Sequence, residues 1–296
     1  MSTVFLVNPA SANGKTGKRW PEIARAVHAA GLRGEAVFSE RAGQLGELAR
    51  EAADEGAKLL VVVGGDGTVH EVVNGIAGRE GVELALIPRG TGWDFARTHA
   101  IPKRLADAIR IARDGKAQPF DLGRATYEPG TAWFANVASV GMSGAVAAKA
   151  NSTTKALGAK TSYLLALGVV FARWKNVHLR VRVDEEERDA LMEDVIVAVG
   201  RYLAGGMMIT PEAEPDDGLF DVLLIGDLTK TELVRVMPKI YRGTHLPHPK
   251  GEVLRGRAVT IEADEPLPIQ LDGEQPGTTP VRFEIVPAAI RLRVPT

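Results

Sequence analysis

The sequence has no cysteine, no excess of either charge and no long apolar run. Without cysteine the protein can hold no disulfide scaffold, no catalytic thiol and no cysteine-ligated zinc, and nothing in it indicates an oxidising compartment. Its 36 Lys and Arg residues nearly balance its 37 Asp and Glu residues, and the formal net charge is −1. A nucleic-acid-binding protein carries a strongly basic surface, so we expect no nucleic-acid partner.

The apolar segments are too short to cross a membrane. A spanning helix needs about 20 apolar residues, and the longest candidate, residues 163–172, has half that length. The N-terminus lacks the basic start and the apolar stretch of a signal peptide. With 45% hydrophobic and 25% charged residues, the composition is that of a globular protein. We therefore expect a soluble, cytoplasmic protein.

The first 121 residues alternate between strand-like and helix-like patterns. Short apolar runs typical of strands occupy residues 4–7, 35–38, 59–63 and 83–87. Between them apolar residues recur at helical spacing, as in residues 69–76. Strands that alternate with helices predict a mostly parallel sheet, and the ligands of such sheets bind at the carboxyl ends of the strands.

After Asp121 the pattern changes to a period of two. Apolar and polar residues alternate in residues 177–183, 281–285 and 290–294, which is typical of half-buried antiparallel strands. Further apolar strand candidates are residues 195–199 and 219–225, and helical patterns are limited to about 144–174 and 230–241. We expect a boundary near Gly123, with an α/β domain over residues 1–123 and an antiparallel, β-rich, sandwich-like domain over residues 124–296.

The strongest motif follows the buried strand at residues 59–63. The chain continues Gly64-Gly65-Asp66-Gly67-Thr68, and a helix begins at or just after Thr68. Glycines let a backbone approach a phosphate, and the helix N-terminus adds partial positive charge. A carboxylate in such a loop is suited to holding Mg²⁺ or accepting a proton. The alternative is a tight turn with Thr68 as the N-cap.

Two further loops follow strands in the same way. Residues 88–97 form a second glycine loop, and residues 8–15 resemble a loose phosphate loop without being a Walker A sequence. Loops at successive strand ends converge on one place, so together they favour nucleotide binding more than each does alone. For Lys15 by itself we favour a solvated surface lysine.

These motifs together resemble the diacylglycerol kinase catalytic-domain family, which includes bacterial lipid kinases, sphingosine kinases and ceramide kinases. The resemblance rests on residues 64–68, Asn8-Pro9, residues 90–97, residues 211–222 and Leu271-Asp272-Gly273-Glu274. Their order and spacing match over residues 3–295. The Gly-Gly-Asp-Gly-Thr core is shared with NAD kinases and phosphofructokinases, whereas the combination with the last two motifs is specific.

The resemblance implies an ATP-dependent, Mg²⁺-using lipid kinase that phosphorylates the hydroxyl of a diacylglycerol-like or long-chain lipid. Asp66, Asp94 and Asp121 would form an acidic network around the catalytic Mg²⁺ and its waters. Because they follow strands at one sheet edge, they can share one metal shell. The nucleotide would contact Asn8, Pro9, Ala10, Ser11, Ala12, Ser39, Gly64, Gly65, Asp66, Gly67, Thr68, Val69, His70 and Thr91. Ser39 stands where the family more often has Thr.

The resemblance also assigns roles in the second domain. Glu274 would accept the proton of the lipid hydroxyl, and since it must reach the nucleotide, we expect the active site in the cleft between the domains. A second, structural Mg²⁺ would bind at Glu214, Asp217 and Leu219. The alternative for both segments is a plain turn, because Asp-Gly pairs at 272–273 and 217–218 are frequent turn residues.

Two residues depart from the family pattern. His70 replaces an Asn common in bacterial members, and Trp93 replaces the Asn that usually precedes Asp94. Trp has only an N–H donor and cannot supply an amide oxygen. The local hydrogen bonding and the substrate edge of the site are therefore in question, although we expect kinase activity to persist.

The sequence says less about which residues bind the lipid, which the resemblance places at a membrane surface, by peripheral contact at the inner face. Residues 163–174 are apolar and flanked by Lys and Arg, which fits a surface that touches a lipid or an anionic membrane. We favour the alternative of an ordinary buried helix with solvated ends. An edge strand in the second domain is a candidate for pairing between two subunits of a homodimer. Two rival functions remain, an NAD kinase-like enzyme and a non-catalytic nucleotide sensor.

Overall fold

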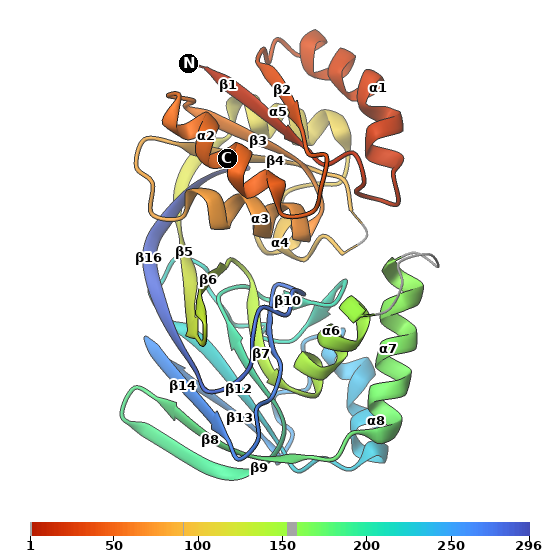
Figure 1. Ribbon diagram of the computed structural model, residues 1–296, viewed down its shortest axis with the longest axis vertical. Helices are drawn as coiled ribbons and strands as arrows, with labels where there is room; N and C mark the ends of the chain where they lie inside the picture. The colour runs from red at the N-terminus through yellow and green to blue at the C-terminus, as the bar shows by residue number, and fades with distance from the viewer. Residues whose placement is uncertain (1, 91, 153–158) are drawn as a thin grey trace. The chain divides into compact units, whose positions relative to one another are not determined.

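The computed structural model describes residues 2–90, 92–152 and 159–296 (Figure 1). The chain divides into two compact units, Met1–Leu122 with Pro287–Thr296 (unit 1) and Gly123–Val286 (unit 2). Two long strands, β5 (Lys116–Tyr127) and β16 (Val281–Val294), run from one unit into the other. The expectation of one boundary near Gly123 did not include the return of Pro287–Thr296 to unit 1, because alternation predicts a strand without saying which sheet it joins.

Unit 1 contains a parallel sheet in the order β2-β1-β3-β4. Its strands are β1 (Thr3–Val7), β2 (Glu35–Phe38), β3 (Leu59–Gly64) and β4 (Glu83–Pro88). The returning end of β16 lies parallel to β4, where Leu292 pairs with Leu84. The expected mostly parallel sheet is confirmed, and every residue of β3 is buried, which accounts for its continuous apolar run.

Helices connect the strands of unit 1. They are α1 (Lys15–Ala29), α2 (Gln44–Asp54), α3 (Asp66–Ile76), α4 (Asp94–Thr98) and α5 (Leu105–Asp114). Ile23 of α1 and Ile109 of α5 share one core cluster with Val61 and Val63 of β3. The alternative in which Thr68 caps a helix is wrong, because α3 begins at Asp66 with Gly65 as its N-cap.

Unit 2 is built from antiparallel strands. They run β13-β12-β9-β8-β14-β16, while β15 and β9 pair with β7, and β5 pairs with β6 and β16. The strands are β6 (Gly130–Phe134), β7 (Val137–Gly141), β8 (Val177–Val183), β9 (Glu186–Ala198), β12 (Phe220–Gly226), β13 (Gly251–Gly256), β14 (Ala258–Ala263) and β15 (Ile269–Leu271). A small hairpin joins β10 (Tyr202–Leu203) and β11 (Met207–Met208). The expected β-rich second region is therefore confirmed.

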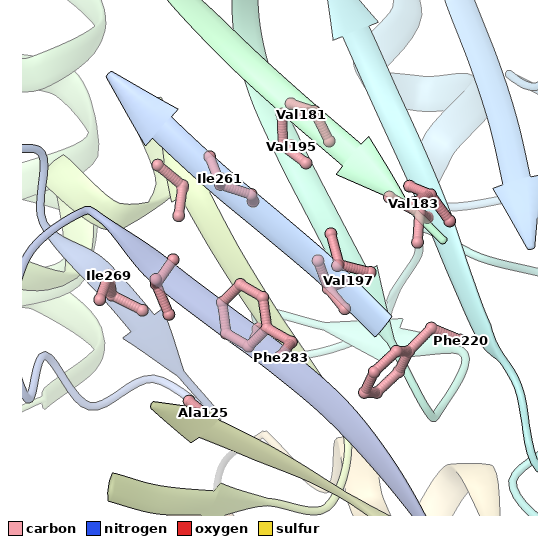
Figure 2. Close-up of a cluster of buried hydrophobic side chains, with 14 of the residues drawn as sticks. Ala125, Val181, Val183, Val195, Val197, Phe220, Ile261, Ile269 and Phe283 are labelled. Carbon is pink, nitrogen blue, oxygen red and sulfur yellow. The ribbon is translucent and has the colours of Figure 1, made fainter. Parts of the chain in front are cut away.

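The core of unit 2 is a layer of aliphatic and phenylalanine side chains. Figure 2 shows Phe220 and Phe283 among valines and isoleucines of several strands. The ring centroid of Phe134 lies 5.8 Å from those of both Phe220 and Phe283. The inward-facing residues of the period-two strands supply this cluster, among them Val181 and Val183 of β8.

The last two strand patterns belong to a single strand. Residues 281–285 and 290–294 were expected as separate strands, whereas β16 runs from Val281 to Val294. Its first part pairs with β14 and its last part with β4. Pro287 lies between these two paired stretches, at the boundary between the units.

Helices α6 (Met142–Ser152), α7 (Ala159–Arg173) and α8 (Lys230–Ile240) gather at one side of unit 2 (Figure 1). The preference for a buried helix is met only in part from Leu165 onward, the part whose side chains are described, because Ala166 is 2% exposed while one face of α7 is open. Leu165 is 51% exposed and Val169 is 41% exposed. In the described part of the chain, no helix is long and apolar enough to cross a membrane.

Candidate functional site

The two glycine loops of unit 1 touch each other through their backbones. The Arg89 N–H, at the end of β4, donates to the Gly64 carbonyl with 2.6 Å between N and O. A Cβ added to Gly90 would lie 2.6 Å from the Gly65 Cα. Because no side chain fits at Gly90, the approach of the loops requires glycine there, and the loops after β3 and β4 meet at one sheet edge.

Asp66 binds the second loop directly. Its Oδ2 accepts the Trp93 N–H at 2.7 Å and its Oδ1 accepts the Phe95 N–H at 3.1 Å. A Cβ on Gly92 would lie 2.4 Å from Asp66 Oδ2 and 3.7 Å from Asp94 Oδ2. The predicted carboxylates of Asp66 and Asp94 therefore flank the same small volume.

Asp94 is buried but has a counter-ion that the sequence reasoning missed. It is 7% exposed, and Arg97 Nη1 donates to its Oδ1 at 2.9 Å. The sequence did contain a sign of this ion pair, because Arg97 follows Asp94 at the i, i+3 spacing of helix α4. The pair gives the acidic site a positive charge whose guanidinium is one-third exposed.

Trp93 contributes to the site with its backbone. Its φ is +68°, a left-handed conformation that Asn adopts readily and bulky residues avoid, which accounts for Asn in the family pattern. The indole N–H donates to the Gly90 carbonyl, and Lys103 Nζ lies 4.2 Å from the ring centroid. Since Asp66 binds the Trp93 backbone N–H, the interaction does not need an amide side chain at this position.

Asn8 joins the loop after β1 to the loop after β3. Its Nδ2 donates to Thr68 Oγ1 at 3.0 Å, and its Oδ1 accepts the Ala10 N–H at 3.0 Å. Ser11 Oγ donates to the Asn8 carbonyl at 2.9 Å. Ala12 has a φ of +53° in the same loop. The structure thus brings together the loops that the sequence reasoning expected to converge.

The other residues predicted to contact the nucleotide differ in their exposure and in their hydrogen bonds. Ser39 follows β2, and its N–H donates to the Val7 carbonyl at 3.1 Å. Val69 is 2% exposed, so only its backbone is available to a ligand. His70 lies on α3, where Asn74 Nδ2 donates to its carbonyl at 2.9 Å. Pro9 is partly exposed, and Thr91 lies outside the described residues.

Asp121 is not at a strand end. It lies inside β5 and is 4% exposed, so the expectation that it follows a strand is wrong. Its Oδ1 accepts the Ala288 N–H at 2.8 Å. This hydrogen bond holds the chain that returns from unit 2.

A neutral histidine lies buried near α4. The ring of His99 is 4.5 Å from Phe95 and 4.4 Å from Phe120, centroid to centroid. Burial lowers the pKa of His99 to about 3, because charging the ring would cost its hydration. The structure places this histidine as a packing residue between two aromatic rings.

In unit 2, Glu274 ends a tight turn. The Leu271 N–H donates to the Glu274 carbonyl at 2.8 Å, and the Glu274 N–H donates back at 2.9 Å. Asp272 and Gly273 have φ values of +49° and +98°, as the two-residue hairpin turns require. Glu274 is exposed, and among the described residues no side chain holds its carboxylate.

Asp272 anchors this turn, a role that the sequence reasoning did not assign. Its carboxylate accepts the N–H groups of Ala135 at 2.8 Å and of Asn136 and Val137 at 3.0 Å each. A carboxylate that binds several amides fixes their positions strongly. The turn is therefore a rigid support for Glu274.

The predicted second metal site contains a cation already. Asp217 pairs with Arg255, and Asp217 Oδ1 accepts the Leu219 N–H at 3.0 Å. The Arg255 Nε lies 3.6 Å from Asp221 Oδ2, and burial raises the pKa of Asp221. Over the described residues, no group of three or more His, Cys, Asp or Glu side chains is placed to hold a metal. Arg255 thus supplies a positive charge beside Asp217, and the metal site at Glu214, Asp217 and Leu219 stays a prediction.

Two family models match the chain. One is described as the diacylglycerol kinase catalytic domain and covers residues 2–125. The other, which covers residues 136–294, is described as the YegS C-terminal NAD kinase beta sandwich-like domain. Together they span both units.

Similar proteins agree with these models. A protein of Staphylococcus carnosus named diacylglycerol kinase is 28% identical over 94% of this chain and 90% of its own length. Its namesake in Staphylococcus aureus strain MRSA252 is also 28% identical, over 94% of this chain and 88% of its own. A crystal structure of a diacylglycerol kinase from Bacillus anthracis shares the fold, with a TM-score of 0.75, 22% identity and coverage of 99% and 96%. An NAD kinase from Archaeoglobus fulgidus in complex with ATP has a TM-score of 0.55, 17% identity and coverage of 98% and 93%.

Proposed function

The chain belongs to the diacylglycerol kinase catalytic-domain family, a family of phosphotransferases, and from that premise we propose that it transfers the γ-phosphate of ATP to the hydroxyl of a diacylglycerol-like or long-chain lipid. The observation that carries the kinase part is the convergence of three loops around Asp66 and Asp94. The relatives named diacylglycerol kinase, which match over 94% of the chain, favour a lipid acceptor over NAD.

The phosphates of ATP are proposed to lie on the loop after β3. Gly67 is exposed at the start of α3, where helix N–H groups have no partner within the helix. Such groups and the helix dipole favour a bound anion. Asn8 and Thr68, joined by their hydrogen bond, would hold the loop after β1 in place beside the nucleotide.

Asp66 and Asp94 fit the donor chemistry of Mg²⁺, which prefers a few carboxylates with waters and phosphate oxygens. Each Asp66 oxygen already accepts a backbone N–H, so Asp66 is suited to holding a water of the metal shell. Asp94, with one oxygen on Arg97, has its Oδ2 near the same volume. When bound, the metal would neutralise charge on the transferred phosphate.

Glu274 is proposed as the proton acceptor. As the lipid hydroxyl oxygen bonds to the γ-phosphorus, the bond to the bridging oxygen of ADP breaks and the hydroxyl proton passes to the Glu274 carboxylate. Glu274 is suited to this step, because the backbone of its turn is held in place while its carboxylate oxygens are open to a ligand.

Peripheral contact with a lipid surface is proposed at α7. Leu165 and Val169 are exposed one helical turn apart, and Arg173 at the helix end and Lys175 are also exposed. An apolar stripe beside cations is the pattern that lies on anionic membranes.

The test is an incubation with labelled ATP, Mg²⁺ and a panel of lipids, with NAD as the competing acceptor. A labelled lipid supports the proposal, labelled NADP would replace it with the NAD kinase alternative, and ATP binding without any labelled product would leave a nucleotide sensor. Asp66→Asn should lose the transfer. Asp264→Asn, the same change at an exposed position, is the matched control and should keep it.

A further inference from the structure

A buried chain of polar side chains in unit 2 leads from β9 to the turn of Glu274. Asp194 on β9 is 5% exposed, Ser139 on β7 is 0% exposed and Gln270 on β15 is 3% exposed. Ser143, in the first turn of α6, lies between Asp194 and Ser139: its Oγ is 2.9 Å from Asp194 Oδ1 and 2.6 Å from Ser139 Oγ. Its N–H donates to Asp194 Oδ2 at 2.9 Å.

Gln270 connects this chain to the turn. In the orientation that gives each amide atom a complementary partner, its nitrogen donates to Ser139 Oγ at 3.1 Å and to the Val137 carbonyl at 3.2 Å. Its oxygen then accepts the Gly273 N–H at 2.8 Å. Gly273 directly precedes Glu274, so the Gln270 side chain holds the backbone that carries the proposed proton acceptor.

Each hydroxyl in this chain has one proton to donate and two lone pairs that accept, so the charge of Asp194 decides where the Ser143 proton goes. When Asp194 is ionised, Ser143 donates to Asp194, Ser139 donates to Ser143, and Gln270 donates to Ser139. When Asp194 is protonated, it donates to Ser143, Ser143 donates to Ser139, and the Ser139 proton is released to compete for the Gln270 oxygen. In the orientation in which that oxygen faces Ser139, the Gly273 N–H loses its acceptor.

We propose that Asp194, Ser143, Ser139 and Gln270 are positioning residues for Glu274, and that the ionised carboxylate of Asp194 sets the hydrogen-bond direction in which Gln270 holds the Gly273 N–H. The proposal rests on the role of Glu274 in the proposed function. None of the four residues belongs to the motifs that identify the family. This chain of hydrogen bonds from Asp194 to Gln270, called the relay below, therefore adds to the site residues that no sequence motif indicated.

The carboxyl group of Asp194 changes its charge within a pH range that an enzyme assay can cover. Burial raises the pKa of Asp194 to about 8, the hydrogen bonds from Ser143 oppose this, and the charge of Glu193 adds to it. The pKa of Glu193 is itself raised to about 7, by burial and then by Asp227, while Lys230 lowers it. Since the folded-state pKa of Asp194 is raised, the held turn is populated above about pH 8 and is lost as the pH falls.

Asp194→Asn tests the direction of the chain. The Asn oxygen can keep the Ser143 N–H, while its NH₂ donates to Ser143 Oγ and releases the Ser139 proton toward Gln270 at every pH. We expect kcat to fall about threefold to tenfold, the value of one hydrogen bond, with ATP affinity unchanged. The rise of kcat with pH through the Asp194 titration should disappear. Asp189→Asn, on the same strand but half-exposed, is the matched control and should keep both.

A second readout does not depend on catalysis. Hydrogen exchange of the Gly273 amide, corrected for its intrinsic pH dependence, should be more protected above the Asp194 titration than below it in the wild type. In Asp194→Asn the protection should be low at every pH. Gln270→Met removes the acceptor from the other end of the chain and should give the same low, pH-independent protection, which keeps the test available if Asp194→Asn fails to fold.

The outcomes separate the relay from the proposed function. Equal Gly273 protection in wild type and variants at every pH would overturn the relay, as would variants that lose stability while keeping the wild-type pH profile. If the protection follows the predicted pattern while no lipid is phosphorylated by the wild type, the relay stands and the proposed function fails.

Discussion

Two turns of this molecule are organised by an aspartate, and they use it differently. In unit 1, Asp66 accepts two backbone N–H groups from the loop after β4 and is also the residue proposed to serve the metal shell. In unit 2, Asp272 accepts three backbone N–H groups, while the chemistry is assigned to Glu274, two residues later. Structure and chemistry thus share one side chain in the first turn and are divided between two in the second.

Because of this difference, a substitution in the second turn has a simpler interpretation than one in the first. A change at Asp66 removes a charge and also disturbs the second glycine loop. A change at Glu274 leaves the bonds of the turn in place, because none of them uses its carboxylate.

Asp66→Asn should abolish phosphoryl transfer and also lower stability. The Asn NH₂ would face a backbone N–H where an oxygen now accepts one, and leaving such a donor unpaired costs about 1–3 kcal/mol. Turnover with labelled ATP and the midpoint of urea unfolding measure the two effects. Near-wild-type turnover would remove Asp66 from the catalytic assignment, and unchanged stability would remove its structural role.

Glu274→Gln should lower kcat by about 10²–10⁴-fold, the usual contribution of a positioned general base. Gln keeps the size and one acceptor oxygen but takes no proton. ATP affinity and the unfolding midpoint should stay at wild-type values, in contrast to Asp66→Asn. Glu265→Gln, at an exposed position, is the matched control. A large loss of ATP affinity would instead assign Glu274 to the nucleotide site.

Asp272→Asn should destabilise the protein by about 1–3 kcal/mol. Asp272 Oδ1 accepts the Asn136 and Val137 N–H groups, so the Asn oxygen can keep these, and the Ala135 N–H then faces an NH₂. We expect a lower melting temperature and a smaller loss of kcat than in Glu274→Gln. A variant as stable as the wild type would mean that the turn needs no anchor.

Asp217→Ala should have the smallest effect, about 1 kcal/mol or less, because its partner Arg255 is half-exposed and exposed ion pairs contribute little. The wild-type melting temperature should be the same with Mg²⁺ and with a chelator. A Mg²⁺-dependent rise that the variant lacks would instead support the predicted structural metal, since an ion bound to the native state raises its stability with concentration.

Local pattern predicted much of unit 1. The buried run of β3, the helical spacing after it and the glycines between them indicated the strand, the helix and the loop. The proximity of Asp66 and Asp94 followed from the rule that parallel strands end at one sheet edge. These features depend on residues near one another in the chain or on a general property of sheets.

The features that the sequence did not predict depend on contacts between distant residues. Alternation in residues 290–294 gave no sign that Leu292 pairs with β4. The Asp-Gly pair at 272–273 predicted a turn, but its acceptance of N–H groups from the start of β7 required the fold. The chain from Asp194 to Gln270 joins residues on different strands, and no short motif marks it.

The return of β16 to unit 1 has a consequence for synthesis of the chain. The Arg293 side chain pairs with Glu83 at 2.7 Å, and the Gly78 N–H donates to the Ala289 carbonyl at 3.0 Å, so these bonds cannot form until residues 289–293 have left the ribosome. A nascent chain that ends near Leu122 presents β4 as an open sheet edge, which is a template for aggregation. A fragment of residues 1–122 should therefore be less soluble than the same fragment joined to residues 287–296.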